Sequence, residues 1–342
     1  MHHPLRLTID RSALQANWRW LADRAAVPAG AAIKADGYGI GSRETMDTLL
    51  EAGCRDFFVS TWAEAEELGT LPEAASLVVL HGVGPNDLEA AARLRARPVL
   101  NSVEQVERWK QLDPRRPCDV MIDTGMNRLG IRAEEADCLD GLSIDTLMSH
   151  LACADEDHPL NAMQLERFRA AAGAVPAKRY SLANSAGICL GRDYAFDLVR
   201  PGLALYGGIP RREAEGAIRQ VAHVEAAIVQ RRTIRAGESC GYGATFVAQA
   251  DTEAAILNIG YADGYLRGFS SRGTAYAGEL ALPVLGRVSM DLIAVGCDAA
   301  PHLKEGDWVE LAYQLPDAAA QSGLSQYELL TTLGDRFERR WR

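Results

Sequence analysis

A repeated alternation of short apolar runs and amphipathic helical stretches, from Asp10 to about Gly208, most constrains how this chain can fold. Such alternation is typical of βα units on a parallel sheet, and the eight units found here predict a closed (β/α)8, TIM-like barrel. Helical patterns such as residues 61–68 and 160–172 lie between the expected strands. Those strands cover residues 30–34, 56–60, 77–81, 97–100, 118–123, 144–149, 179–182 and 202–206.

After about residue 219 the pattern changes to short alternating segments separated by glycine, which predicts an antiparallel β domain. We therefore expect an α/β protein with an N-terminal barrel over residues 9–218 and a C-terminal β domain over residues 219–342. Residues 1–8 can add a strand to the β domain. The expected strands of this domain include residues 224–233, 254–259, 280–284 and 308–311.

Composition narrows the class of partner. The 342 residues carry a net charge of −10, which argues against nucleic acid and anionic membranes, because a protein that follows phosphates needs a basic face. A small-molecule substrate is favoured, and no apolar stretch is long enough to predict a membrane span. The seven cysteines form no CxxC pair, which predicts free thiols and a cytoplasmic location. His150 and Cys153 are spaced like half a metal site, but without a second half we expect no metal.

Lys34 is one of only four lysines in the chain and lies in the run Ala-Ala-Ile-Lys-Ala-Asp-Gly-Tyr-Gly over residues 31–39. Arginine serves equally well as a surface charge, but only a lysine amine can lose its proton and condense with an aldehyde to form a Schiff base. The apolar residues before Lys34 predict a buried strand, and Gly37, Tyr38 and Gly39 predict a loop that approaches a ligand. This combination points to pyridoxal phosphate.

Other chemically useful residues also follow expected strands. In a (β/α)8 barrel, chemistry gathers at the C-terminal ends of the strands. Small residues after the seventh and eighth expected strands predict a phosphate site there. Lys34 ends the first expected strand, Arg128 follows the fifth, His150 ends the sixth, Asn184 and Ser185 follow the seventh, and Arg200 with Gly202 introduces the eighth.

Eight separate motifs agree in order and spacing with one family. Through them the chain resembles bacterial alanine racemase over nearly its whole length. This resemblance implies a barrel that binds pyridoxal phosphate and a β domain that completes the active site of the partner subunit in a homodimer. The motifs are KADGYG (34–39), DTGMNRLG (123–130), SHLA (149–152), ANSA (183–186), RPG (200–202), GYGAT (241–245), GYADG (260–264) and GRVSMD (286–291).

The resemblance implies two opposed bases, because racemisation removes a proton from one face of the substrate Cα and returns one to the other face. Lys34 would take the proton of the D-enantiomer, and Tyr242 from the other subunit that of the L-enantiomer. Arg200 would face the pyridine nitrogen of the cofactor, and His150 would orient Arg200. An arginine there leaves the ring a weaker electron sink than a carboxylate would, which disfavours transamination.

The resemblance also implies the groups that bind cofactor and substrate. Cofactor phosphate contacts would come from the hydroxyls of Tyr38, Ser185 and Tyr327 and the amides of Gly202 and Leu203, with Asn184 beside them. Arg128 would contact the cofactor and the substrate carboxylate, and the Met290 amide would be a second carboxylate donor. Asp155, Tyr261, Arg267 and Arg287 match the corridor through which substrate enters.

Two departures from the family pattern stand out. Met121 replaces a lysine found in many members seven residues before the arginine, so other contacts must orient Arg128. Asp36, Gly37 and Ile40 replace the usual asparagine, alanine and histidine after the cofactor lysine. These changes bear on rate and substrate range more than on reaction class.

The implied activity is that of an isomerase that interconverts L- and D-alanine, in D-alanine biosynthesis for the cell wall or in alanine catabolism. A racemase of the same fold for another amino acid, such as serine, is the alternative. A non-catalytic pyridoxal phosphate carrier is disfavoured because such carriers lack the β domain. A related decarboxylase is disfavoured because Cys240 is followed by Gly-Tyr-Gly rather than by an acidic residue.

Overall fold

The computed structural model describes residues 3–342 and divides into two compact units. The first, here called the barrel unit, comprises Leu14–Leu205 and Ile209–Arg219. The second, here called the β unit, comprises the chain up to Ala13 together with Tyr206–Gly208 and Gln220–Arg342. None of the helices between residues 3 and 342 combines the length and the apolar character that crossing a bilayer requires.

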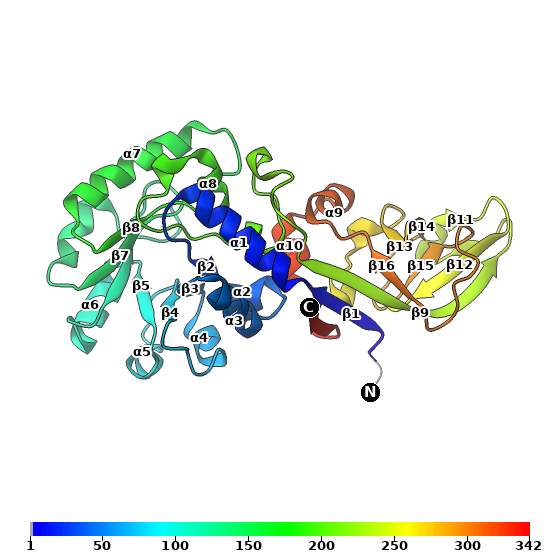
Figure 1. The fold of residues 1–342 in the computed structure, drawn as a ribbon, viewed down its shortest axis with the longest axis horizontal. Coiled ribbons are helices and arrows are strands. Elements are labelled where there is room, and N and C mark those ends of the chain that lie inside the picture. Colours follow the sequence, from blue (N-terminus) through cyan, green and yellow to red (C-terminus); the bar gives the residue numbers. More distant parts are fainter. Residues whose placement is uncertain (1–2) are drawn as a thin grey trace. The chain divides into compact units, whose positions relative to one another are not determined.

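The barrel unit is built on parallel strands joined by helices, as the alternation in the sequence predicts (Figure 1). Its sheet has the order β2-β3-β4-β5-β6-β7-β8, so each strand pairs with the next along the chain. The strands are β2 (Ala31–Ala32), β3 (Asp56–Val59), β4 (Ser76–Val79), β5 (Arg97–Leu100), β6 (Cys118–Met121), β7 (Ile144–Met148) and β8 (Arg179–Ser181). The α-helices are α1 (Arg11–Ala25), α2 (Lys34–Tyr38), α3 (Ser42–Ala52), α4 (Trp62–Glu67), α5 (Leu88–Arg93), α6 (Val103–Leu112), α7 (Pro159–Ala174) and α8 (Ser185–Leu190). Short 3-10 turns are η1 (Ala133–Leu139), η2 (Arg192–Tyr194), η3 (Leu203–Tyr206) and η4 (Arg212–Ala214).

The eighth barrel position differs from the expectation. Residues 202–206 are not a strand, because the apolar run from Leu203 forms the buried 3-10 turn η3. The preceding segment 197–201 takes the strand's place. It bonds to the β8 side through Asp197 N–Tyr180 O and Arg200 N–Ala183 O, each 2.9 Å, and to the β2 side through Gly30 N–Val199 O and Ala32 N–Pro201 O, each 2.9 Å. Arg200 therefore lies within the eighth strand position, and Gly202 follows it.

The short element α2 is not an ordinary right-handed helix, because the chain directly after Lys34 is a turn of left-handed conformation. Ala35, Asp36 and Tyr38 have φ of 53°, 49° and 55°, and Gly37 between them has φ of 60°. A non-glycine residue in this region costs roughly 1–2 kcal/mol, so the surroundings must hold the turn. The bonds Gly39 N–Ala35 O and Ser42 N–Asp36 Oδ1, each 2.9 Å, contribute. Gly37 also suits its packing, because a Cβ there would lie 2.9 Å from Thr45 Oγ1.

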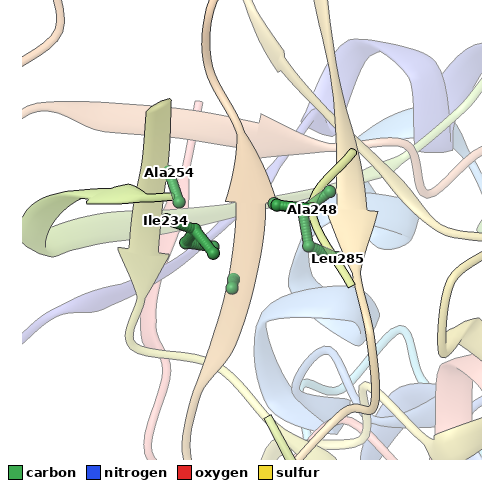
Figure 2. Close-up of a cluster of buried hydrophobic side chains, with 5 residues drawn as sticks. Ile234, Ala248, Ala254 and Leu285 are labelled. Carbon is green, nitrogen blue, oxygen red and sulfur yellow. The ribbon is translucent and has the colours of Figure 1, made fainter. Parts of the chain in front are cut away.

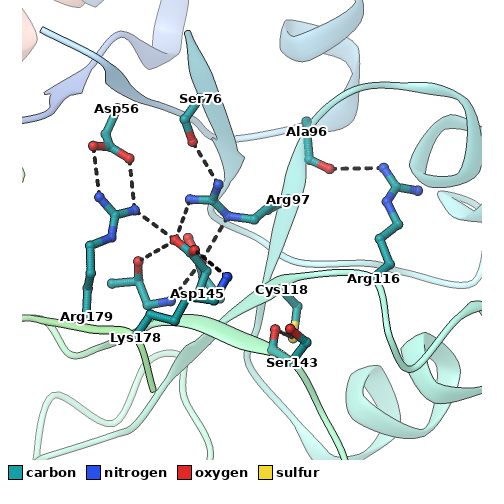
Figure 3. A network of polar contacts seen from close by, with 12 residues as sticks. Asp56, Ser76, Ala96, Arg97, Arg116, Cys118, Ser143, Asp145, Lys178 and Arg179 are labelled. Atoms are coloured by element: carbon teal, nitrogen blue, oxygen red, sulfur yellow. Dashed lines mark hydrogen bonds and ion pairs between the residues drawn. The ribbon is translucent and has the colours of Figure 1, made fainter. Parts of the chain in front are cut away.

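The N-terminal ends of the barrel strands are joined by an ion network (Figure 3). Arg179 at the start of β8 binds both carboxylate oxygens of Asp56 at the start of β3, at 2.9 and 3.0 Å. Arg97 at the start of β5 contacts Asp119 at 3.2 Å and Asp145 at 3.1 Å. Burial raises the pKa of Asp119 to about 6 although Arg97 opposes the shift. This network occupies the strand ends opposite to those that the candidate site uses.

The β unit is a largely antiparallel sheet of order β12-β15-β14-β13-β16-β9-β1-β17, which closes through an added β12–β9 pairing. The segment Leu5–Ile9 forms β1, which pairs antiparallel with β9. Buried Ile234, Ala248, Ala254 and Leu285 form a small apolar cluster in this unit (Figure 2). The strands are β1, β9 (Ala222–Ile234), β10 (Ser239–Cys240), β11 (Phe246–Val247), β12 (Thr252–Leu257), β13 (Thr274–Ala277), β14 (Leu280–Leu285), β15 (Ile293–Gly296), β16 (Trp308–Leu311) and β17 (Glu338–Trp341). The helices are η5 (Tyr242–Ala244), η6 (Tyr261–Asp263), η7 (Arg267–Phe269), α9 (Leu315–Ser322) and α10 (Gln326–Thr331).

Candidate active site

Lys34 follows β2 after one intervening residue, Ile33, at the C-terminal end of the barrel sheet, and is half-buried. Burial lowers the pKa of its amine, the charge of Arg128 lowers it further, and the charge of Glu64 opposes both effects. A lysine amine with a lowered pKa is a better nucleophile and a more useful base near neutral pH. The environment of Lys34 thus suits the chemistry that the sequence predicts for it.

Arg128 lies on a tight loop after β6, and the side chain of Asp123 holds that loop together by hydrogen bonds. The Asp123 carboxylate accepts the amides of Gly125, Met126 and Asn127 at 2.9–3.1 Å. The base of the loop is closed by Asp123 N–Ile131 O at 3.0 Å. These bonds fix the backbone that carries the exposed Arg128 side chain. Met121, which replaces a lysine of many family members, is buried in β6. The bonds of the Asp123 loop are therefore contacts that can orient Arg128 without that lysine.

His150 and Arg200 also lie at the C-terminal ends of the barrel strands, and His150 interacts electrostatically with Arg200, Arg128 and Lys34. Burial lowers the pKa of His150 to about 3, and the charges of Arg200, Arg128 and Lys34 add to the effect. His150 is therefore neutral at physiological pH. Buried Arg200 donates to Ser149 O at 2.6 Å and to the Ser181 hydroxyl. Burial lowers the pKa of Arg200 to about 10, so its guanidinium stays protonated at neutral pH.

Tyr38, Ser185 and Gly202 meet in one small cradle. Ser185 Oγ accepts the amides of Gly202 at 2.9 Å and Ala204 at 3.3 Å, which leaves its hydroxyl hydrogen to donate elsewhere. A Cβ on residue 202 would lie 2.2 Å from the Tyr38 hydroxyl, so a larger residue there would displace the Tyr38 ring. Asn184 caps α8 through Gly187 N–Asn184 Oδ1 at 2.8 Å, and buried Leu203 opens η3. The Gly202 amide, which is expected from the sequence to bind phosphate, donates to Ser185 Oγ in this structure. The neutral hydroxyl groups gathered beside this glycine are donors of a kind that suits an oxyanion.

A second group of predicted residues gathers in the β unit around Tyr242, which is 70% exposed. Tyr242 lies between Gly241 and Gly243, both with positive φ, and a Cβ on Gly243 would approach the Arg287 guanidinium to 3.0 Å. The glycines therefore let this loop and the Arg287 side chain pack closely.

The neighbouring loops of the β unit carry Met290, Tyr261 and Arg267. Two backbone bonds of 3.0 Å, Tyr261 N–Ser289 O and Ala262 N–Met290 O, join the loops. The Arg267 guanidinium stacks over the Tyr261 ring at 5.3 Å. Met290 is 53% exposed, and Tyr327 on α10 is 47% exposed. The β unit thus presents exposed aromatic and apolar side chains at positions where the resemblance implies a shared site.

The structure thus brings together Lys34, Arg128, His150 and Arg200 by electrostatic interaction, and Tyr38, Ser185 and Gly202 by contact, within the barrel unit. Asp155, predicted for the corridor, lies in the exposed loop between β7 and α7. Two residues that support these side chains have no role in the sequence-based prediction. Asp123 lies within one of the motifs, and its carboxylate organises the loop of Arg128. Glu64 forms a capping box with Thr61, a pattern that the T-x-x-E spacing could have revealed.

Within residues 3–342, no three His, Cys, Asp or Glu side chains gather in a way that could hold a metal ion. The seven cysteines all lie in the described part of the chain and are free.

Comparison with protein families assigns nearly the whole chain. The sequence model of the alanine racemase N-terminal domain matches residues 9–210. That of the alanine racemase C-terminal domain matches residues 221–341.

Individual relatives agree. The chain is 43% identical to the catabolic alanine racemase of Agrobacterium fabrum, over 97% of this chain and 91% of that protein. It is 43% identical to the alanine racemase of Dinoroseobacter shibae, over 98% of this chain and 97% of that protein. Among solved structures, it resembles the alanine racemase of Bartonella henselae with covalently bound pyridoxal phosphate, with a TM-score of 0.92, 36% identity and 99% coverage of both chains. The biosynthetic alanine racemase of Pseudomonas aeruginosa gives a TM-score of 0.90 and 32% identity over the full length of both chains.

Proposed function

Because the chain belongs to the alanine racemase family over nearly its whole length, we propose that it interconverts L- and D-alanine with pyridoxal phosphate, using Lys34 and Tyr242 as opposed bases. Family membership makes the chain an isomerase. The observation that carries the proposal is the convergence of Lys34 with Arg128, His150 and Arg200 at the C-terminal strand ends of the barrel. In barrels of this type, those ends carry the active site.

Pyridoxal phosphate fits the barrel residues. Lys34 supplies an amine with a lowered pKa, and the hydroxyls of Tyr38 and Ser185 beside Gly202 supply neutral donors for a phosphate. The residues that we propose to bind the cofactor phosphate also include Asn184, Leu203 and Tyr327. When bound, the cofactor supplies an electrophilic carbon for the substrate amine and a conjugated ring that makes the substrate Cα proton more acidic.

The two bases have separate tasks. Lys34 takes the proton from, or returns it to, the Cα face of the D-enantiomer. Tyr242 does the same for the L-enantiomer, and Arg128 and the Met290 amide hold the substrate carboxylate. The Asp123 loop keeps Arg128 positioned for that task.

Arg200 and His150 set the electrostatics at the cofactor ring. Arg200, protonated at neutral pH, would hold the ring nitrogen of the bound cofactor unprotonated, which would make the ring a weaker electron sink. Neutral His150 adds no charge of its own and can hydrogen-bond within the site. We infer that this arrangement favours reprotonation at Cα over transamination.

Tyr242 is assigned to the partner's site in an isologous homodimer. The exposure of Tyr242, Met290 and Tyr327 supports a surface that a second copy covers. Arg287, Tyr261, Arg267 and Asp155 are assigned to the corridor that admits small substrates. The free cysteines favour a cytoplasmic location, where the enzyme would supply D-alanine for the cell wall or consume it.

The substrate proposal is tested with a panel of L-amino acids and chiral analysis of the products. Alanine should give the highest kcat/KM, with serine and longer side chains slower, because the proposed corridor would admit small side chains and exclude bulky ones. A higher kcat/KM for serine would make the chain a racemase for another amino acid. Absence of D-alanine would overturn the proposal.

The cradle gives a prediction of its own. Gly202→Ala should weaken pyridoxal phosphate binding roughly 5- to 150-fold, because the added methyl displaces Tyr38 and overpacking of this kind costs about 1–3 kcal/mol. Titration of the cofactor-free protein by visible absorbance measures the change. Gly173→Ala is the matched control, since its Cβ in α7 would meet no atom within 4 Å. An unchanged Kd for Gly202→Ala would remove this cradle from the cofactor site.

A further inference from the structure

The side chain of Glu64 does more than an ordinary helix cap requires. Its carboxylate accepts the amides of Ser60 at 2.5 Å and Thr61 at 3.3 Å, while Thr61 Oγ1 accepts the Glu64 amide at 3.1 Å. These contacts form the capping box that begins α4. A capping box needs only the amide of the cap residue as partner for the glutamate.

The other oxygen of the same carboxylate reaches a distant segment. Glu64 Oε1 accepts the amide of Ala35 at 3.0 Å, and Ala35 lies 29 residues earlier in the chain. Ala35 directly follows Lys34 and opens the left-handed turn. One side chain on α4 therefore joins the β3–α4 turn to the strained backbone that directly follows the lysine. Strained backbone of this kind persists only where its surroundings hold it in place.

The charge of Glu64 also acts on the amine of Lys34, whose pKa it raises. Among residues 3–342, the charged groups that act on the Lys34 amine are Arg128, from the loop after β6, and Glu64, from α4. The charge of Lys34 lowers the pKa of His150, but His150 is neutral and so places no charge beside the Lys34 amine. The positive charge of Arg128 disfavours protonated Lys34, and the negative charge of Glu64 favours it. Glu64 is thus the counter-charge at this amine.

We propose that Glu64 is a positioning residue for Lys34, whose carboxylate clamps the left-handed turn through the Ala35 amide and balances the charge of Arg128 at the Lys34 amine. The inference deepens the proposed function, since it rests on Lys34 being the reactive lysine. It assigns to α4 a part in setting both the place and the basicity of that lysine.

Only a carboxylate of this length can fulfil both parts. A carboxylate presents two acceptor oxygens and can accept three amides, whereas glutamine presents one oxygen and directs an NH2 group at the remaining amides. Glu64→Gln therefore removes the charge and part of the clamp. Glu64→Asp keeps the charge but shortens the side chain, so it should release the Ala35 amide.

The test uses full-length, cofactor-free protein and two readouts that need no activity. Limited reductive methylation with isotope-labelled formaldehyde, followed by peptide mass spectrometry across a pH series, gives the titration midpoint of each lysine. Hydrogen exchange measures the protection of the Ala35 amide. Glu135→Gln is the matched control, because Glu135 likewise accepts a backbone amide, that of Arg132 at 3.1 Å, where η1 begins.

We expect Glu64→Gln to lower the Lys34 midpoint by about one pH unit, as loss of a nearby counter-charge does, and to leave Lys110, Lys178 and Lys304 unchanged. Glu64→Asp should speed exchange of the Ala35 amide about tenfold, as loss of its hydrogen bond allows, with a smaller change in the Lys34 midpoint. Glu135→Gln should change neither readout.

Either variant can overturn the proposal. A wild-type Lys34 midpoint in folded Glu64→Gln would remove the electrostatic part, and wild-type protection of Ala35 in Glu64→Asp would remove the clamp. Mapping of borohydride-fixed cofactor to another lysine would instead refute the proposed function. The two failures are therefore distinguishable.

Discussion

Lys34→Ala is expected to abolish alanine racemisation, lowering kcat by ~10³-fold or more, because it removes one of the two proposed bases and the proposed attachment point of the cofactor. The purified variant should also lose the yellow colour expected of the wild-type protein. In wild type, borohydride should fix the cofactor to Lys34, and peptide mapping of the reduced protein locates it.

The control is Lys178→Ala in the same unit. Its amine is largely exposed and lies 3.7 Å from Asp145, an ion pair worth ~1 kcal/mol at most. This variant should keep its colour and its kcat. Borohydride label on Lys110, Lys178 or Lys304 in the wild-type protein would contradict the assignment of Lys34.

Tyr242→Phe should reduce racemisation to a similar extent, because it removes only the phenolic oxygen that serves as the second base and keeps the ring. Mixing this variant with Lys34→Ala tests which chain Tyr242 serves. In a hybrid dimer, one site combines both defects, and the other draws Lys34 from one chain and Tyr242 from its partner. Subunit exchange between two inactive proteins should therefore restore activity, up to one working site per hybrid dimer.

Tyr276→Phe is the matched control for this experiment, since Tyr276 is another exposed tyrosine of the β unit, on β13. It should keep wild-type activity. Hybrids that are verified by mass but stay inactive would show that Tyr242 serves its own chain, and they would refute the shared site of the isologous dimer.

The barrel could be predicted from the sequence because seven of its strands coincide with short apolar runs between helical patterns. The eighth was misplaced for a physical reason. Residues 203–206 are apolar but are buried as a 3-10 turn, and a short apolar run does not distinguish these two states. The true segment contains Arg200 and Pro201, which obscure a strand pattern. Pro201 is tolerated because it enters the ladder through its carbonyl, which accepts the Ala32 amide.

The candidate site was predictable in its residue types but not in its supports. Gly37 and Gly39 signal a turn after Lys34, whereas nothing in Ala35 or Tyr38 signals a left-handed backbone, since neither residue prefers it. The capping box of Glu64 is visible in the spacing of Thr61 and Glu64. Its bond to Ala35 is not, because that contact depends on how the first two βα units of the barrel pack together.

The central claim, racemisation by two opposed bases, is tested most directly by the reaction of L-alanine in D2O with wild-type protein, sampled at early times. Chiral separation and mass spectrometry then give the deuterium at Cα of each enantiomer. Because different groups would act on the two faces, the D-alanine formed should be almost wholly deuterated while recovered L-alanine keeps most of its protium. Equal deuterium in both enantiomers would indicate a single base and would contradict the assignment of Lys34 and Tyr242 to opposite faces.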